Sequence, residues 1–202
     1  MNMALYGSVV VTLFVIMDPI GIIPVFLALV GKRPAPEVHR LAWQAALTSL
    51  LVITIFAVFG DAILSYLHIS LPALRVAGGL LLLVVALQLL LRGDLPSGAA
   101  DDNANIALVP LGTPLLAGPG AIVAAILFVR DATGPTDLVA IAGGIVTIHL
   151  IIFLALRFST AIMRVIRPAG VTVISRIAGV LLAAIAVQLT ADGIHGFILS
   201  WQ

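Results

Sequence analysis

The sequence predicts an all-α membrane protein of six transmembrane helices, arranged as two inverted three-helix repeats with helices 1 and 4 broken at the midplane. Three observations predict this fold. The 202 residues are 62% hydrophobic and only 9% charged, a composition typical of integral membrane proteins. The chain contains six apolar stretches of membrane-spanning length, and motifs from its first half recur roughly 100 residues later.

The six apolar stretches are each near or above the length of about 20 residues that a helix needs to cross a bilayer. The connections between them are short, so we expect no soluble domain. The first stretch lacks the cationic start of a secretory signal peptide and exceeds its length, so we expect it to remain as a span. The stretches cover residues 4–30, 41–67, 71–91, 106–129, 138–158 and 174–200.

Lysine and arginine are distributed unevenly between the two sides of the expected bundle. Cytoplasmic connections carry an excess of these residues. Only Arg75 and Arg130 lie on one side, and the other eight of the ten lie in or near connections one, three and five. We therefore expect both termini to be non-cytoplasmic. The eight are Lys32, Arg33, Arg40, Arg92, Arg157, Arg164, Arg167 and Arg176.

The third and sixth stretches carry the clearest internal repeat. The motif RVAG at Arg75 recurs as RIAG at Arg176, and ALQL, ending at Leu89, recurs as AVQL, ending at Leu189. Because three spans is an odd number, the second half must cross the membrane in the opposite sense, as in many secondary transporters. The repeat divides the chain into a first repeat at 1–93, a polar linker at 94–105 and a second repeat at 106–202.

Two of the stretches contain helix-breaking residues near their midpoints, D-P-I-G-I-I-P at 18–24 and G-P-G at 118–120. Helix breaks at this depth are tolerated where protein or a water-filled cavity satisfies the backbone, and an ionisable residue there indicates a functional site. Packing kinks are the alternative, because proline and glycine are frequent in membrane helices. The matched depth of the breaks and the carboxylate of Asp18 favour a site.

Both breaks resemble helix starts. Asp18 can cap free N–H groups, and Pro19 fits the first helical position. Gly118-Pro119 has the same form without a carboxylate, so its positive helix end can bind an anion, and a Cβ at Gly120 would enter the space of that anion. Asp18 would meet a substrate ammonium or a coupling cation. The expected substrate-binding residues are Asp18, Pro19, Gly21, Pro24, Thr113, Pro114, Gly118, Pro119, Gly120 and Ala121.

Five further polar residues are candidates for coupling or for support of the site. Gln88 and Gln188 occupy equivalent positions and are expected chiefly to form interhelical hydrogen bonds. His149 is a proton carrier or, as we favour, a satisfied buried histidine. Arg75 and Arg176 lie at helix starts, where snorkelling or structural pairing is favoured over ligand binding.

Four segments carry a family resemblance: DPIGIIPVF at 18–26, LPALRVAGG at 71–79, PLGTPLLAGPGAI at 110–122 and RIAGVLLAAIAVQ at 176–188. Together they resemble the MarC family, also called the small neutral amino-acid transporter family. The resemblance implies a six-span protein of the inner (plasma) membrane, with some relatives associated with transport of glycine, alanine and similar amino acids. Such relatives often carry Asn where this chain has Ile22, which leaves the substrate open.

The sequence therefore predicts a secondary transporter of small neutral amino acids such as glycine, alanine and serine, coupled to H+ or Na+. A non-transporting channel or scaffold is the alternative. No enzyme is expected, because Asp18 has no second intramembrane carboxylate beside it. We expect no metal, no cofactor and no nucleic acid, because the chain has no cysteine, scattered histidines and a net charge of +1. The expected partners are the lipid bilayer and the amino acid, and a homo-oligomer is left open.

Overall fold

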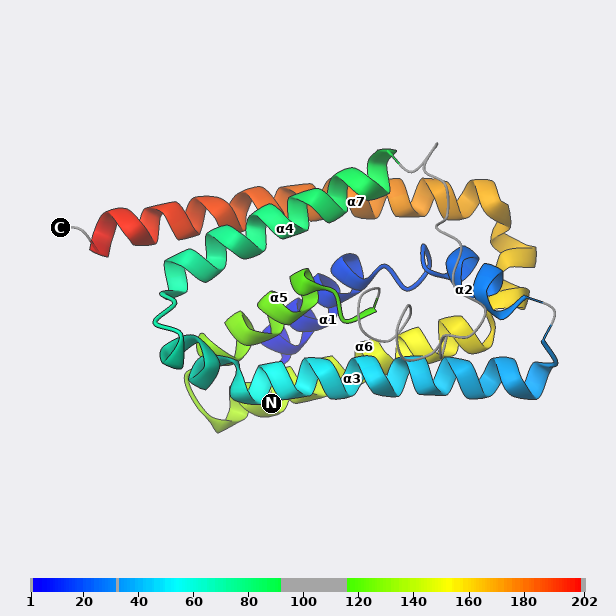
Figure 1. Cartoon of the computed structure of the whole chain (residues 1–202), viewed down its shortest axis with the longest axis horizontal. Helices are drawn as coiled ribbons and strands as arrows, with labels where there is room; N and C mark the ends of the chain where they lie inside the picture. The colour runs from blue at the N-terminus through cyan, green and yellow to red at the C-terminus, as the bar shows by residue number, and fades with distance from the viewer. Residues whose placement is uncertain (1, 32, 92–115, 201–202) are drawn as a thin grey trace.

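The structure is a computed structural model that describes residues 2–31, 33–91 and 116–200. Within these ranges all regular structure is helical (Figure 1). Thr113, Pro114 and the expected linker at 94–105 lie outside the described residues. The helices are α1 Met3–Met17, α2 Ile23–Val30, α3 Ala35–Tyr66, α4 Leu71–Leu91, α5 Pro119–Arg130, α6 Pro135–Arg157 and α7 Ser159–Ser200.

Four helices, α3, α4, α6 and α7, are long and apolar enough to cross a membrane. Helices α1 and α5 are apolar but shorter than the roughly 20 residues that a bilayer requires. The first apolar stretch is divided by a break at 18–22 into α1 and α2, and α5 begins at Pro119, within the fourth stretch. The C-terminal end of α1 and the N-terminal end of α5 therefore lie inside the bundle, away from the two ends of the bundle (Figure 1).

The last helix differs from its prediction. We expected a connection from Arg157 to Pro168 and a span at 174–200, but α7 starts at Ser159 and bends at Arg167, whose φ of 61° and ψ of 161° are not helical. The bend lies where it does because the residue before a proline avoids the α-helical region, and Pro168 cannot donate a backbone hydrogen bond. The segment before the bend, residues 159–166, is a short helix of about two turns that carries the exposed Arg164.

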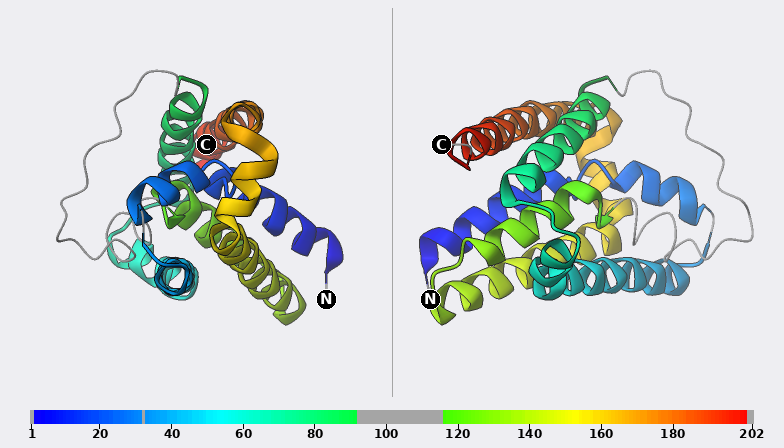
Figure 2. Two further views of the ribbon diagram at one scale, coloured as in Figure 1. Left: turned by 90° about the vertical axis from the view of Figure 1, so that its right-hand side faces the viewer. Right: turned by 60° about the vertical axis from the view of Figure 1, so that its left-hand side comes forward.

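Helices α4 and α7 lie side by side, α3 and α6 pack together on the opposite side, and α1 and α5 lie between these pairs (Figures 1 and 2). The α4–α7 contact is close because glycines face backbone. A Cβ at Gly79 would lie 2.7 Å from the carbonyl oxygen of Ala186, and one at Gly179 would lie 3.3 Å from that of Ala86. Small residues allow membrane helices to approach in this way.

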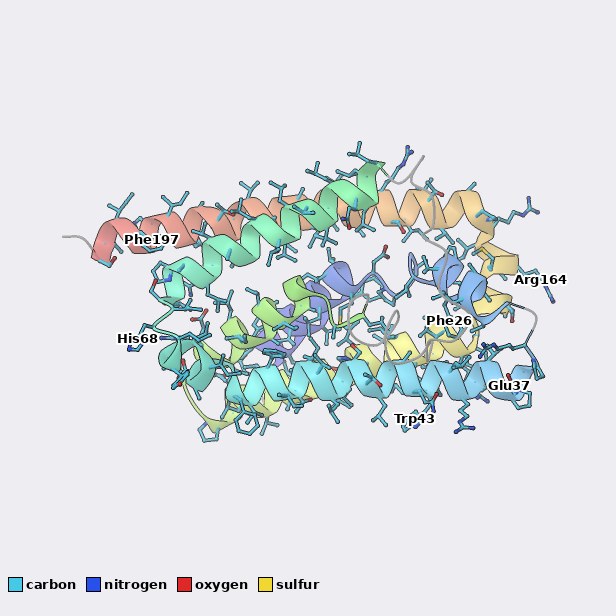
Figure 3. All side chains as sticks on the ribbon, in the orientation of Figure 1. Phe26, Glu37, Trp43, His68, Arg164 and Phe197 are labelled. Atoms are coloured by element: carbon cyan, nitrogen blue, oxygen red, sulfur yellow. The ribbon has the colours of Figure 1, made fainter. Side chains whose placement is uncertain are left out.

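Large apolar side chains cover the outside of the bundle. Trp43, Phe59, Leu150 and Val187 are each more than half exposed. Soluble monomers rarely expose apolar surface on this scale, whereas lipid covers it at no cost. Polar side chains lie at the two ends of the bundle. Figure 3 shows His68 at one end, where Phe197 also lies, and Glu37 and Arg164 at the other. Helix α1 begins, and α7 ends, at the end that carries His68 (Figures 2 and 3).

Candidate functional site

Asp18 ends α1 and caps the turn that follows it. Its backbone is left-handed, with φ 38° and ψ 66°, a conformation that aspartate adopts more readily than most residues. Its N–H donates to the carbonyl oxygen of Phe14 at 3.1 Å, and its Oδ1 accepts from the N–H of Gly21 at 3.0 Å. The expected capping bond is present, but the second half-helix does not begin at Pro19. Residues 19–22 form a turn instead, and α2 starts at Ile23.

The second carboxylate oxygen of Asp18, Oδ2, is buried and has no hydrogen-bond partner among the described residues. Asp18 itself is only 8% exposed. A buried polar atom without a partner is costly, so this oxygen requires an explanation, such as a ligand or an ion. Asp18 is also one of the residues that line the cavity between the two breaks.

Ser175 of α7 lies beside Asp18, which the sequence did not predict. A Cβ placed on Gly21 would contact both Asp18 Oδ2 and Ser175 Oγ, so the two oxygens flank the same point. Ser175 is buried, with 8% exposure. Gly21 is required at this position because its missing side chain leaves room for the two oxygens. Nothing in the sequence pattern signals Ser175, since its place depends on how α7 crosses the break.

The break at Gly118 forms the start of α5, as the Gly118-Pro119 pattern predicts. Gly118 has an extended backbone, with φ −62° and ψ 161°, and precedes the first helical residue. Its carbonyl oxygen accepts from the N–H of Ala121 at 3.0 Å and from that of Ile122 at 3.1 Å. The Ala121 N–H is therefore engaged in the first turn and is not free to donate to an anion, which corrects the binding role expected of Ala121. The positive end of the α5 dipole still points into the bundle.

A cavity of about 130 Å³ lies between the two breaks. The negative end of α1, with the carboxylate of Asp18, lies on one side, and the positive end of α5, which has no acidic residue in its first turn, lies on the other. One side of the cavity thus favours a cation and the other an anion. Its described lining is Ile16, Met17, Asp18, Gly21, Ile22, Val25, Val85, Gln88, Leu89, Leu116, Gly118, Gly120 and Ala121.

The expected binding residues divide into two groups. Asp18, Gly21, Gly118, Gly120 and Ala121 all line the cavity. Pro19 and Pro24 are not among the described lining residues: Pro19 follows Asp18 in the turn, and Pro24 lies in the first turn of α2. Pro119 is the first residue of α5.

The role expected for Gly120 needs a correction. A Cβ on Gly120 would contact Leu82 of α4, with Leu82 Cγ at 3.2 Å and Ile16 Cγ2 at 3.6 Å. The added atom would therefore meet apolar side chains, and not the space of a bound anion. The close approach that Gly120 permits is between α5 and α4.

The glutamines lie in different surroundings despite their equivalent places in the repeat. Gln88 lines the cavity. Gln188 Nε2 donates to Asp192 Oδ1 at 2.8 Å within α7, so this bond lies within one helix and not between helices as expected. The two residues are four apart on one helix, a spacing at which side chains meet.

The remaining candidates lie outside this cavity. His149 is buried, its Nδ1 donates to the carbonyl oxygen of Ile145 at 2.7 Å, and its Nε2 accepts from the Ser49 hydroxyl at 3.1 Å. Both ring nitrogens are thus satisfied, which agrees with a structural role. Arg75 Nη2 donates to both carboxylate oxygens of Asp131, at 3.1 and 3.0 Å, so it is paired. Arg176 is exposed on α7.

A bundle of long apolar helices with an apolar exterior defines a multi-pass integral membrane protein. Residues 3–198 match the family model described as "MarC family integral membrane protein", and the chain belongs to this family.

Proteins of archaea and bacteria are similar to the chain over nearly their whole length. A UPF0056 membrane protein of Methanocaldococcus jannaschii is 35% identical, with 93% of this chain and 95% of the relative covered. One of Aquifex aeolicus is 32% identical, with 96% and 94% covered. The UPF0056 membrane protein YvbG of Bacillus subtilis is 32% identical, with 93% of each covered. These names give no activity. No solved structure matches the chain.

Proposed function

We propose that the protein is a secondary transporter of small neutral amino acids, such as glycine, alanine and serine, coupled to a proton or Na+. The observation that carries the proposal is the pair of helix ends of opposite polarity that face one cavity inside the membrane bundle. Transporters with broken helices place the N-terminal end of a half-helix at an anionic substrate group, and the C-terminal end of another at a cation.

The zwitterion common to all amino acids suits this arrangement. Its ammonium group would bind Asp18 Oδ2, the buried oxygen that has no partner among the described residues, with Ser175 Oγ close by. Its carboxylate would lie at the N-terminal end of α5, near Gly118 and Gly120. A coupling cation would compete with the ammonium group for Asp18. Through this competition one carboxylate would link the movements of the two solutes.

The size of the cavity supports a small substrate. Sites for drug-sized ligands span roughly 300–1,000 Å³, whereas this cavity measures about 130 Å³. An engineered cavity of about 150 Å³ binds benzene, which has as many non-hydrogen atoms as alanine. Leucine and lysine are larger, so we expect the cavity walls to exclude them.

The inverted repeat is part of the proposal, and reciprocal contacts support it. Gly79 packs against Ala186, and Gly179, 100 residues later, packs against Ala86, 100 residues before Ala186. Each contact is therefore the counterpart of the other in the two proposed halves. The hydrogen bond between Ser49 and His149 joins positions 100 residues apart, as expected for a pair on a pseudo-two-fold axis. Two related halves can expose one central site to either side in turn.

We further propose that the protein lies in the inner (plasma) membrane with both chain ends non-cytoplasmic. Figure 3 places Glu37 and Arg164 at one end of the bundle. Arg33 and Arg40 lie within four residues of Glu37 in the sequence, and Arg157 is the last residue of α6, just before the start of α7. Helix α1 begins and α7 ends at the opposite end (Figure 2). The excess of positive charge is expected on the cytoplasmic side.

Substitution of Asp18 tests the function directly. Asp18→Asn keeps a side chain that can cap Gly21 but removes the negative charge. In liposomes that contain the purified protein, we expect alanine uptake to fall by about a hundredfold, since an unpaired ammonium in a buried site costs roughly 2–5 kcal/mol. Asp61→Asn is the matched control, because Asp61 pairs with Arg130 near the end of α3 and does not line this cavity. Wild-type uptake by the Asp18 variant would reduce Asp18 to a structural cap, and absence of any uptake by the wild type would favour a non-transporting channel or scaffold.

A further inference from the structure

A second cavity, of about 230 Å³, lies beside the first and has no part in the proposed binding site. It differs from the first in carrying charged groups of both signs. Its lining residues are Thr12, Ile16, Arg75, Leu82, Ala124, Leu127, Phe128, Asp131, Ile185, Leu189 and Asp192.

The two cavities follow one another along the same helices. On α1 the second cavity is lined by Thr12 and the first by Asp18, and Ile16 between them lines both. On α4 and α5 the order is the same: residues from Arg75 to Leu82 and from Ala124 to Asp131 line the second cavity, and later α4 residues and the start of α5 line the first. The second cavity therefore extends from the broken helix ends toward the end of the bundle, over about 10 Å between Leu82 and Arg75 at 1.5 Å per residue.

A single layer of side chains separates the cavities. Leu82 is 1% exposed and Ile16 is 8% exposed. Both pack onto Gly120, since a Cβ there would contact the Leu82 side chain and lie 3.6 Å from Ile16 Cγ2. The side chains that close the passage thus come from α4 and α1, and they pack against Gly120 of α5, which has no side chain.

The outer part of the second cavity suits a zwitterion. Arg75 and Asp131 form a bidentate pair whose side chains are 27% and 55% exposed, so solvent reaches it. Asp192, which accepts from Gln188, lies on the same cavity wall. A solute with one positive and one negative group can exchange with the Arg75–Asp131 pair without leaving either charge of the pair unpaired, and Asp192 offers its positive group a further carboxylate.

We propose that the second cavity is a vestibule that leads zwitterionic solute to the central cavity, and that Leu82 and Ile16, packed on Gly120, form the gate between the two. The inference rests on the proposed function for the identity of the solute, but the gate itself does not depend on it. Movement of α4 by a small amount relative to α5 would open the passage, because Leu82 of α4 packs directly on Gly120 of α5 at this layer.

Cysteine labelling tests the gate, and the chain contains no cysteine of its own. Leu127→Cys reports on the vestibule and Val85→Cys on the central cavity. A membrane-impermeant cationic methanethiosulfonate reagent is applied to intact cells and to inside-out vesicles, and the side that labels Leu127→Cys is then used throughout. We expect Val85→Cys to be labelled slowly from that side.

Removal of the gate should speed this labelling. Combined with Val85→Cys, Leu82→Ala should raise the labelling rate about tenfold, equivalent to a barrier lower by roughly 1.4 kcal/mol. Leu81→Ala is the matched control, because Leu81 is the adjacent α4 residue and is 41% exposed on the outer face. Ile16→Ala provides a second variant that opens the layer from α1, should Leu82→Ala not fold.

The outcomes separate the gate from the substrate. An unchanged rate in both gate variants, an equal increase in the Leu81 control, or no labelling of Leu127→Cys from either side would overturn the gate. Unchanged labelling of Leu127→Cys in the Leu82→Ala background shows that the vestibule remains intact. Because labelling needs no amino acid, a working gate in a protein that binds none would reject the amino-acid substrate alone.

Discussion

At the scale of single residues, the chemistry of the site depends on a few short polar groups in an apolar bundle. One carboxylate oxygen of Asp18 accepts from the backbone of Gly21, and the other is buried without a partner among the described residues. The sequence predicted this residue because a carboxylate beside a proline at mid-membrane is rarely neutral to function. It could not predict Ser175, which reaches the site only through tertiary packing, and it misjudged Gly120, whose neighbour is a side chain of α4.

Ser175 offers a prediction at this scale. Ser175→Ala removes the hydroxyl beside Asp18, and we expect binding of alanine to weaken roughly tenfold, because a hydrogen bond to a charged group contributes about 1.5–3 kcal/mol. Binding by calorimetry measures the effect. Ser159→Ala is the control, since Ser159 is also a buried serine of α7 but lies at the start of that helix and does not line the central cavity. Equal losses in both variants would assign the effect to general packing.

At the scale of helices, the apolar stretches predicted α4 at its observed bounds and α6 within a few residues. Length and hydropathy suffice there because lipid imposes both. The prediction failed for residues 159–166, which carry Arg164 and lie at the membrane end, so their helix has no long apolar run to reveal it. The breaks were predictable from proline and glycine, but the turn at 19–22 was not, since it depends on the capping bond of Asp18.

The α4–α7 contact gives a prediction for helices. A Cβ at Gly79 would lie 2.7 Å from a backbone oxygen and 2.9 Å from a backbone nitrogen of α7, which cannot move without shifting the helix. We expect Gly79→Ala to destabilise the protein by about 1–3 kcal/mol, measured as a lower midpoint of thermal unfolding in detergent. Gly7→Ala, with nothing within 4 Å of the added Cβ, should be neutral or stabilising. A Gly79 variant as stable as the Gly7 variant would contradict the close contact.

At the scale of the whole molecule, the two ends of the bundle differ in charge, and this difference sets the expected orientation. Ala35→Cys, at the start of α3, should be labelled by an impermeant thiol reagent only from the cytoplasmic side. Ser200→Cys, at the end of α7, should be labelled only from the other side. The reverse pattern would invert the orientation and with it the side to which the vestibule opens.

Each of the two proposed halves contributes one helix to the central cavity that is broken or that begins inside the bundle. The proposed repeat rests on two motifs that recur 101 and 100 residues apart. The cavity was not predictable from the sequence, because its volume and the layer at Leu82 depend on how four helices meet.

Competition among amino acids for the central cavity tests the central claim most directly. Purified protein is loaded with radiolabelled alanine, and unlabelled glycine, alanine, serine, leucine and lysine are added in turn. The cavity of about 130 Å³, with opposite helix ends on its two sides, predicts displacement by glycine, alanine and serine, and little by leucine or lysine. Equal displacement by leucine and lysine, or no binding of alanine at all, would contradict it.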